Sequence, residues 1–147
     1  MKQNVGKKGS IVYTLDQVEH VVDEIYPLFE QHAVITLTGS LGAGKTTLTQ
    51  ALLKRAGVAG LVQSPTFNYM NRHMTKDGTT IYHFDLYRFH SPKEFQEAGF
   101  DEYLYQPNSK VLIEWPAVIM PLLKHDVCHL VLDYEGLEMR RLAYQCV

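Results

Sequence analysis

The sequence predicts an α/β fold, a single domain in which helices flank a mixed central sheet and an antiparallel hairpin is inserted. Two observations lead to this class. An apolar run at residues 33–38 is followed by a glycine-rich segment and then by a helical pattern, the strand–loop–helix order of a phosphate-binding unit. After residue 65, short apolar runs alternate with turn signals, which is typical of strands paired in both directions.

The first half of the chain is predicted to hold two helices around one buried strand. Residues 1–9 are expected to be frayed, and residues 10–147 to form the domain, beginning with a strand at 10–13. Thr14 and Gln17 form a capping-box pattern, which marks a helix start. The strand at residues 33–38 precedes a helix at 45–56. The first helix has apolar side chains at helical spacing, at Val18, Val21, Val22, Ile25, Leu28 and Phe29.

The second half is predicted to be mostly sheet. Residues 66–74 and 80–87 form an antiparallel hairpin around the turn Asp77-Gly78, a dipeptide typical of hairpins. Ser91 precedes Pro92, and this pair predicts a helix start. Further elements are expected at residues 101–105 (a short helix), 110–114, 127–134 and 138–145 (three strands).

Composition and charge exclude several classes of protein. The chain has 147 residues, 46% of them hydrophobic, and its 14 Lys and Arg against 16 Asp and Glu leave a net charge of −2. This balance argues against a broad basic surface for nucleic acid. The sequence has neither an apolar run long enough to cross a membrane nor an apolar segment behind its basic N-terminus. We therefore expect a cytoplasmic protein of one domain.

Neither the cysteines nor the histidines predict a metal centre. Cys128 and Cys146 are the only cysteines, and they are expected to be reduced, inert thiols. The seven histidines form no His-x-x-x-His or Cys/His cluster, so they are expected to be ordinary surface or half-buried side chains rather than zinc ligands.

The strongest motif is a complete Walker A sequence, Gly39-x-x-x-x-Gly44-Lys45-Thr46. Its glycines let backbone N–H groups approach a phosphate closely, and the helix that follows directs the positive end of its dipole at the same anion. Lys45 adds a positive charge for the β- and γ-phosphates, and Thr46 offers a hydroxyl to Mg²⁺. The motif predicts a nucleotide site in a P-loop NTPase-like domain.

Two acids are candidates for the metal and for catalysis. Glu114 ends the apolar run Val111-Leu112-Ile113, and Asp85 ends a second predicted strand. Ligands of open α/β sheets bind where parallel strands end. The two acids together suggest a division of labour, in which one holds the metal and the other orients or deprotonates the attacking water.

Three other functions are compared with an ATPase. A GTPase is disfavoured because the sequence has no Asn-Lys-x-Asp motif. A small-molecule kinase remains an alternative, although no segment resembles the Arg-bearing lid that such enzymes close over phosphates. A nucleotide-dependent adaptor without hydrolysis also remains open.

Four segments carry a resemblance to a known family. They are GSLGAGKTTLTQ, VQSPTFNY, IYHFDLYRF and VLIEWP, in this order. Together they closely resemble the TsaE (YjeE) family, the P-loop ATPases of bacterial tRNA N6-threonylcarbamoyladenosine synthesis. The match is dense from Gly39 to Pro116 and looser elsewhere.

The resemblance implies roles for individual residues. Asp85 matches an acid required for hydrolysis, Thr66 matches a residue facing the γ-phosphate, and Lys45 completes the catalytic set. Thr46 and Glu114 match the ligands of Mg²⁺. The expected ATP contacts are Thr14, Gly39, Gly42, Ala43, Gly44, Lys45, Thr46, Thr47 and Trp115.

The resemblance also implies a function. Family members bind ATP and Mg²⁺, hydrolyse ATP weakly alone, and assist the threonylcarbamoyl transferase (TsaD type) and its paralogous partner (TsaB type), so tRNA is reached only indirectly. The modified base is adenosine 37 of tRNAs that read codons beginning with A. This chain departs from the usual pattern at Ser40, where relatives often have an acid, and at Leu137, where they often have Arg. Arg140 and Arg141 are the nearest cations.

Overall fold

The computed structural model describes residues 6–60, 62, 65 and 69–147, and within them one mixed sheet dominates. Its strands stand in the order β1-β7-β6-β2-β5-β4-β3. Their bounds are β1 Lys8–Thr14, β2 Val34–Gly39, β3 Met70–Met74, β4 Thr80–Asp85, β5 Ser109–Glu114, β6 Val127–Tyr134 and β7 Met139–Cys146.

The four inner strands of the sheet are parallel. β2 pairs in parallel with β5 and with β6, and β5 pairs in parallel with β4. The outer pairs β1/β7, β6/β7 and β3/β4 are antiparallel. The carboxyl ends of β2, β4 and β5 therefore meet at one edge, where Glu114 is in register with both Leu37 and Asp85. The predicted α/β class with a mixed sheet is confirmed.

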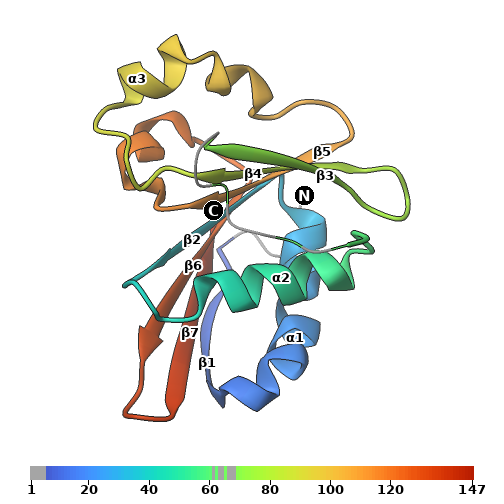
Figure 1. The fold of residues 1–147 in the computed structure, drawn as a ribbon, viewed down its shortest axis with the longest axis vertical. Helices are drawn as coiled ribbons and strands as arrows, with labels where there is room; N and C mark the ends of the chain where they lie inside the picture. The colour runs from blue at the N-terminus through green and yellow to red at the C-terminus, as the bar shows by residue number, and fades with distance from the viewer. Residues whose placement is uncertain (1–5, 61, 63–64, 66–68) are drawn as a thin grey trace.

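Helices cover both faces of the sheet (Figure 1). α1 (Val18–Gln31) and α2 (Lys45–Arg55) pack together on one face. The short α3 (Pro92–Glu97) lies on the opposite side with two 3₁₀ turns, η2 (Phe100–Tyr103) and η3 (Pro116–Leu122). A third 3₁₀ turn, η1 (Leu15–Gln17), leads from β1 into α1.

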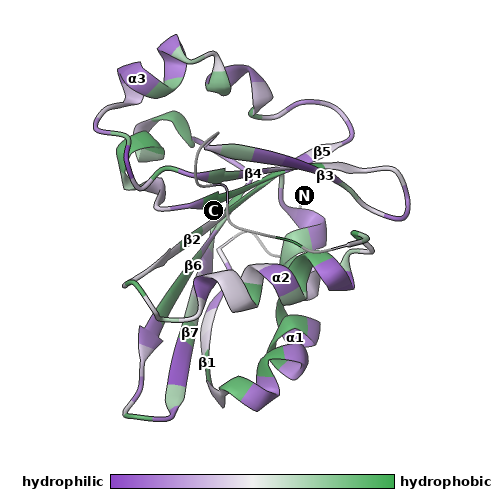
Figure 2. Cartoon of the chain, viewed as in Figure 1, coloured by the Kyte–Doolittle hydropathy of each residue, from purple (hydrophilic) through white to green (hydrophobic). Residues whose placement is uncertain are grey.

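Two apolar cores follow from the alternation of side chains along the inner strands. Ile35, Leu37 and Leu112 point to the face of α1 and α2, whereas Val34 and Ile113 point to the face of α3. Figure 2 shows hydrophobic colour along β2 and β6 and alternating colours along α1. Each fully buried aliphatic side chain stabilises the fold by about 1.5–3 kcal/mol. The packing of the inner strands therefore fixes the position of their carboxyl ends.

Local signals placed most elements correctly, with shifts at their ends. The amide of Thr14 donates to Oε1 of Gln17 at 2.9 Å, as in the predicted capping box. Ser91 Oγ accepts from the amide of Glu94 at 3.3 Å, which confirms the predicted cap. β1 begins at Lys8, so the prediction that residues 8 and 9 are frayed is wrong; backbone pairing with β7 holds them.

Two predicted elements differ from the structure, one observed element was not predicted, and one prediction lies partly outside the described residues. The strand expected at residues 80–87 ends at Asp85, because the chain turns there through a hydrogen bond from the amide of Phe89 to the carbonyl of Leu86. The helix expected at residues 101–105 is the 3₁₀ turn η2, and η3 was not predicted. Of the strand expected at 66–74, residues 66–68 lie outside the described residues.

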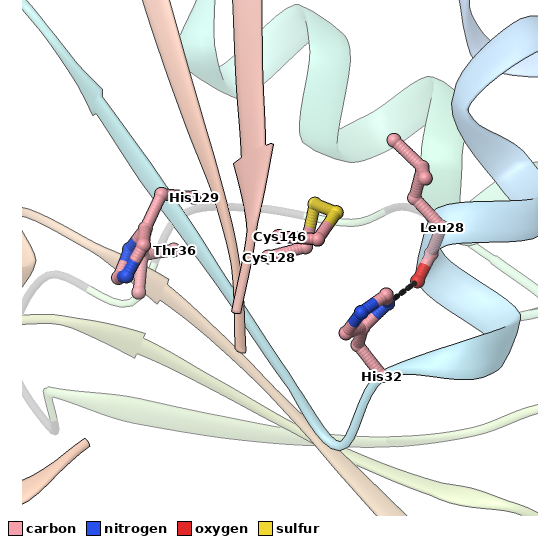
Figure 3. The surroundings of a disulfide bond; sticks show 6 residues. All are labelled: Leu28, His32, Thr36, Cys128, His129 and Cys146. Carbon is pink, nitrogen blue, oxygen red and sulfur yellow. Dashed lines mark hydrogen bonds between the residues drawn. A yellow bond between two sulfur atoms is a disulfide. The ribbon is translucent and has the colours of Figure 1, made fainter. Parts of the chain in front are cut away.

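Cys128 and Cys146 form a disulfide (Figure 3), so the prediction of two free thiols is wrong. The two residues are cross-strand partners in the β6–β7 pair, and neither is exposed to solvent. They are 18 residues apart in the sequence, and only the register of the hairpin brings them face to face. Among the described helices, none has the length and apolar character needed to span a membrane.

Candidate functional site

A cleft of about 360 Å³ opens at the edge where β2, β4 and β5 end. Most of the residues predicted for the site line this one cleft, although they come from different elements. Its walls are Leu41, Gly42, Gly44, Lys45, Thr46, Thr47, Asp85, Glu114 and Trp115.

The loop between β2 and α2 requires glycine for two physical reasons. Gly44 has φ of +102° and Gly42 has φ of +79°, conformations that are unfavourable for residues with a Cβ. At Gly39 a Cβ would lie 2.5 Å from the backbone oxygen of Leu132, which is closer than a real contact allows. The loop thus reaches α2 with its amides oriented as a helix start, where N–H groups lack partners within the helix and attract anions.

Lys45 is held within the loop. Its Nζ donates to the carbonyl of Gly39 at 2.6 Å and to that of Ser40 at 3.0 Å, and it lies 4.2 Å from the ring centroid of Trp115. The residue is only 7% exposed. Burial lowers the pKa of Lys45, and the charges of Glu114 and Asp85 oppose this shift. The ammonium therefore lies at the base of the cleft on neutral carbonyl acceptors.

Glu114 lines the cleft from the end of β5 and is 2% exposed. Its Oε2 lies 2.7 Å from Nε2 of His83, which is itself fully buried. The prediction that the histidines are surface or half-buried side chains is wrong for His83 and for His32, which are both fully buried. A buried carboxylate needs such a partner, because leaving a charge without one in the interior is strongly unfavourable.

Asp85 is in register with Glu114 but has a different environment. Its Oδ1 accepts a hydrogen bond from the amide of Tyr87 at 3.1 Å. Burial raises the pKa of Asp85, the Tyr87 amide opposes this, and the charge of Glu114 adds to the rise. Asp85 also borders a second hollow of about 130 Å³ with Pro65, Tyr69, Tyr87 and Arg88. The two acids thus differ in both exposure and partners.

Trp115 closes the cleft beside Lys45. Its φ is +56°, an uncommon conformation for a side chain of this size. The amide of Trp115 donates to the carbonyl of Leu37 at 3.3 Å, and the ring packs against Tyr87 with centroids 4.9 Å apart. These contacts fix the indole at the edge of the sheet.

Three predicted site residues that the structure describes do not line the cleft, and a fourth lies outside the described residues. Gly39 and Ala43 support the loop from beneath, the first through its carbonyl and the second fully buried. Thr14 ends β1, where its hydroxyl donates to Asp16. Thr66 lies outside the described residues.

Sequence reasoning missed two residues that hold the site. Tyr134 donates from Oη to the carbonyl of Gly42 at 2.7 Å, and His83 contacts Glu114. The alternation of Ile81, His83 and Asp85 along one strand could have placed His83 on the face of the acids. No comparable signal exists for Tyr134, because its contact spans 92 residues.

The cations near Leu137 do not line the cleft. Leu137 is almost fully exposed. Arg141 pairs with Glu135 through two contacts of 3.1 and 3.0 Å, and the guanidinium of Arg140 stacks 4.2 Å from the ring centroid of Tyr134.

The donor set of the cleft fits a magnesium nucleotide. Thr46, Glu114 and Asp85, which carry hydroxyl and carboxylate oxygens, line the same cleft as the glycines of the loop. Mg²⁺ prefers such hard oxygen ligands and usually takes only one or two carboxylates from the protein.

Comparison with known proteins identifies the family of this chain. The family described as "Threonylcarbamoyl adenosine biosynthesis protein TsaE" matches residues 12–142. The tRNA threonylcarbamoyladenosine biosynthesis protein TsaE of Haemophilus influenzae is 43% identical over 86 residues, which is 58% of this chain and 53% of that protein. The protein of the same name from Bacillus subtilis is 34% identical over 115 residues, 78% of this chain and 70% of that protein.

The match to the H. influenzae relative spans about half of that protein's length. Among solved structures, the crystal structure of Bacillus subtilis YdiB superimposes with a TM-score of 0.74 at 25% identity, covering 99% of this chain and 89% of that one. This agreement confirms the P-loop NTPase-like fold. Because the family match extends over residues 12–142 and nearly the whole fold is shared, the chain belongs to the TsaE family of threonylcarbamoyl adenosine biosynthesis proteins.

Proposed function

We propose that the chain binds ATP with Mg²⁺ and hydrolyses it, as an accessory protein in the threonylcarbamoylation of adenosine 37 in tRNAs that read codons beginning with A. One observation carries the proposal: loop amides, Lys45, Thr46 and two acids line a single cleft at the carboxyl edge of the parallel strands. The pathway comes from the names of the relatives.

The loop amides and four side chains of the cleft each have a role in this proposal. The loop amides and Lys45 hold the β- and γ-phosphates, and Lys45 exchanges its neutral carbonyl acceptors for anionic oxygens. Thr46 and Glu114 hold Mg²⁺, which when bound offsets negative charge on the phosphates. Asp85 orients or deprotonates the water, and its raised pKa brings the carboxylate closer to the range where a general base works well. We also propose a contact to the γ-phosphate for Thr66, which lies outside the described residues.

The partners follow from the pathway and from the charge. We assign a TsaD-type transferase subunit and its TsaB-type paralogue as partners, with tRNA reached only through them. A net charge of −2 fits a protein partner better than a polyanion. The domain comprises residues 10–147 and the two strand residues before them, and it works in the cytoplasm as a weak ATPase that its partners activate.

Replacing Lys45 with alanine tests the nucleotide site. We expect Lys45→Ala to lower ATP affinity at least tenfold in a calorimetric titration, because a charge-assisted contact to phosphate is lost. Lys54→Ala is the matched control, since Lys54 is an exposed lysine of the same helix. Equal ATP affinity of Lys45→Ala and wild type would refute the site.

Turnover distinguishes the ATPase from its rivals. Phosphate release from γ-³²P-labelled ATP should rise when the transferase pair is added. Transfer of the label to a metabolite would instead indicate a kinase, and nucleotide-dependent partner binding without phosphate release would indicate an adaptor.

A further inference from the structure

A buried histidine lies directly behind the cleft. His83 and Glu114 come from the parallel neighbours β4 and β5, and their side chains meet at 2.7 Å between Nε2 and Oε2. The side chain of His83 has no exposure and that of Glu114 has 3%. One side of the Glu114 carboxylate is thus held from within the sheet, while the residue lines the cleft.

The second ring nitrogen of His83 indicates how the contact is made. Within the described part of the chain, Nδ1 is buried and has no hydrogen-bond partner. A neutral ring that carries its proton on Nε2 leaves only a lone pair at Nδ1. A proton on Nδ1 would be a buried donor without an acceptor, which is rarer and less favourable. His83 therefore donates from Nε2 to Glu114.

The contact is more specific than the packing of a core histidine. His32 is equally buried, but its Nδ1 lies 2.8 Å from the backbone oxygen of Leu28 and so serves a helix end. The His83 bond is made instead to a carboxylate of the cleft. His73 lies behind His83 with ring centroids 6.2 Å apart, so the ring is enclosed on the side away from Glu114.

We propose that His83 is a positioning residue, which holds the carboxylate of Glu114 in the orientation that the divalent cation of the nucleotide requires. This inference rests on the proposed binding of a magnesium nucleotide. Partners of this kind orient metal-binding side chains in general, and their loss usually weakens metal affinity by about 10- to 100-fold.

Three substitutions at His83 separate positioning from packing. In His83→Gln the side-chain amide can reach the place of Nε2, in His83→Asn it reaches only the place of Nδ1, and in His83→Phe the volume stays but no donor remains. His32→Phe is the control for the general effect of losing a buried histidine. The readout is the Mg²⁺ concentration that gives half-maximal ATP binding, together with the melting temperature without ligand.

We expect His83→Phe and His83→Asn to raise the Mg²⁺ concentration for half-maximal ATP binding about tenfold or more. His83→Gln should keep this concentration close to the wild-type value. ATP affinity in the presence of a chelator should not change. His32→Phe should lower the melting temperature and leave the Mg²⁺ requirement as in wild type. In ligand-free protein, ¹⁵N spectra should show the proton of His83 on Nε2.

The outcomes that overturn the inference differ from those that overturn the function. If wild type needs Mg²⁺ and Glu114→Gln raises the Mg²⁺ concentration that ATP binding requires, but folded His83→Phe behaves as wild type, only the positioning role is refuted. Equal behaviour of the Gln and Asn variants, or a proton on Nδ1, also refutes it. If wild-type ATP binding ignores Mg²⁺, the metal assignment and the positioning role both fail.

Discussion

The two acids of the cleft are in register on neighbouring strands, yet they differ in burial and in hydrogen-bond partners. Glu114 is almost fully buried and contacts His83. Asp85 is partly exposed and accepts a hydrogen bond only from the Tyr87 amide among the described contacts. A carboxylate fixed by a partner suits metal binding, whereas a less constrained one suits the activation of water. The different surroundings of the two acids support the proposed division of labour, which stays a prediction.

The raised pKa of Asp85 predicts a pH-dependent effect on stability. The folded state holds the Asp85 proton more tightly than the unfolded chain, because burial disfavours the carboxylate. Its contribution to stability is therefore neutral below the ordinary pKa of 3.8 and becomes unfavourable as the pH rises through the folded pKa. Asp85→Asn should raise the melting temperature of nucleotide-free protein relative to wild type, and this difference should grow from acid to neutral pH.

Thermal denaturation across this pH range checks the Asp85 prediction. Asp101→Asn is a suitable control, because Asp101 is exposed and does not line the cleft. A difference that shrinks towards neutral pH would contradict the assigned environment. In the assembled complex, Asp85→Asn should retain ATP binding and lose most of the turnover.

Gly44 tests the link between backbone conformation and binding. Gly44→Ala and Gly78→Ala both place a Cβ on a residue with positive φ, +102° and +88°, and each should destabilise the fold by about 1–2 kcal/mol. Of these two glycines, Gly44 lines the cleft and Gly78 does not. Gly44→Ala should therefore also abolish tight ATP binding, whereas Gly78→Ala should keep it. Denaturant unfolding and ATP titration of both variants measure the two effects. Equal ATP affinities would argue against phosphate binding by the loop at Gly44.

At the level of elements, the C-terminal hairpin supports the phosphate loop. Strand β6 pairs with β2 through the whole length of β2, and the carbonyl of Leu132 leaves room only for glycine at position 39. At the end of β6, Tyr134 bonds to the carbonyl of Gly42, and the guanidinium of its cross-strand partner Arg140 stacks on its ring. The loop is thus held by its own sequence and by a hairpin about 90 residues away.

Removing the Tyr134 hydroxyl should loosen the loop. A hydrogen bond of this kind contributes about 0.5–1.5 kcal/mol, so Tyr134→Phe should weaken ATP binding by about two- to tenfold. Tyr105→Phe is the matched control, because its Oη donates to the carbonyl of His125 at the same distance, 2.7 Å, without lining the cleft. ATP titration of the two variants measures the difference. Equal losses, or none in Tyr134→Phe, would show that the hairpin does not act on the loop.

At the level of the whole molecule, the disulfide closes the hairpin that supports the loop. Cys128 and Cys146 lie at the end of the β6–β7 pair farthest from Tyr134 in the register. A cross-link of this span stabilises a protein by about 3 kcal/mol in the chain-entropy estimate. Reduction should therefore lower the melting temperature by about 5–10 °C.

Differential scanning calorimetry with and without a reductant tests the disulfide. The double variant Cys128→Ala with Cys146→Ala should melt at the same temperature under both conditions, which controls for other effects of the reductant. Equal melting temperatures of the oxidised and reduced wild type would mean that the cross-link adds nothing to the stability of the sheet. ATP affinity should fall little on reduction, because Tyr134 is held by its own contacts.

The residues that line the cleft could largely be predicted from the sequence, because their signal is local. Gly39, Gly44, Lys45 and Thr46 stand within eight consecutive positions, and one strand–loop–helix unit places them all. Glu114 and Asp85 could also be predicted, since each ends an apolar strand and parallel strands end at a common edge. The capping boxes and turns are equally local, and so the order of most elements followed from them.

The contacts that complete the site and the fold are long-range, and only the tertiary structure decided them. His83 meets Glu114 across 31 residues, Tyr134 meets Gly42 across 92, and Cys128 meets Cys146 across 18. Each depends on the register between strands, and a shift of one residue would turn every side chain of a strand to the other face. The sequence by itself determined which loop and strand-end residues line the cleft, and strand pairing decided which side chains hold those residues in place.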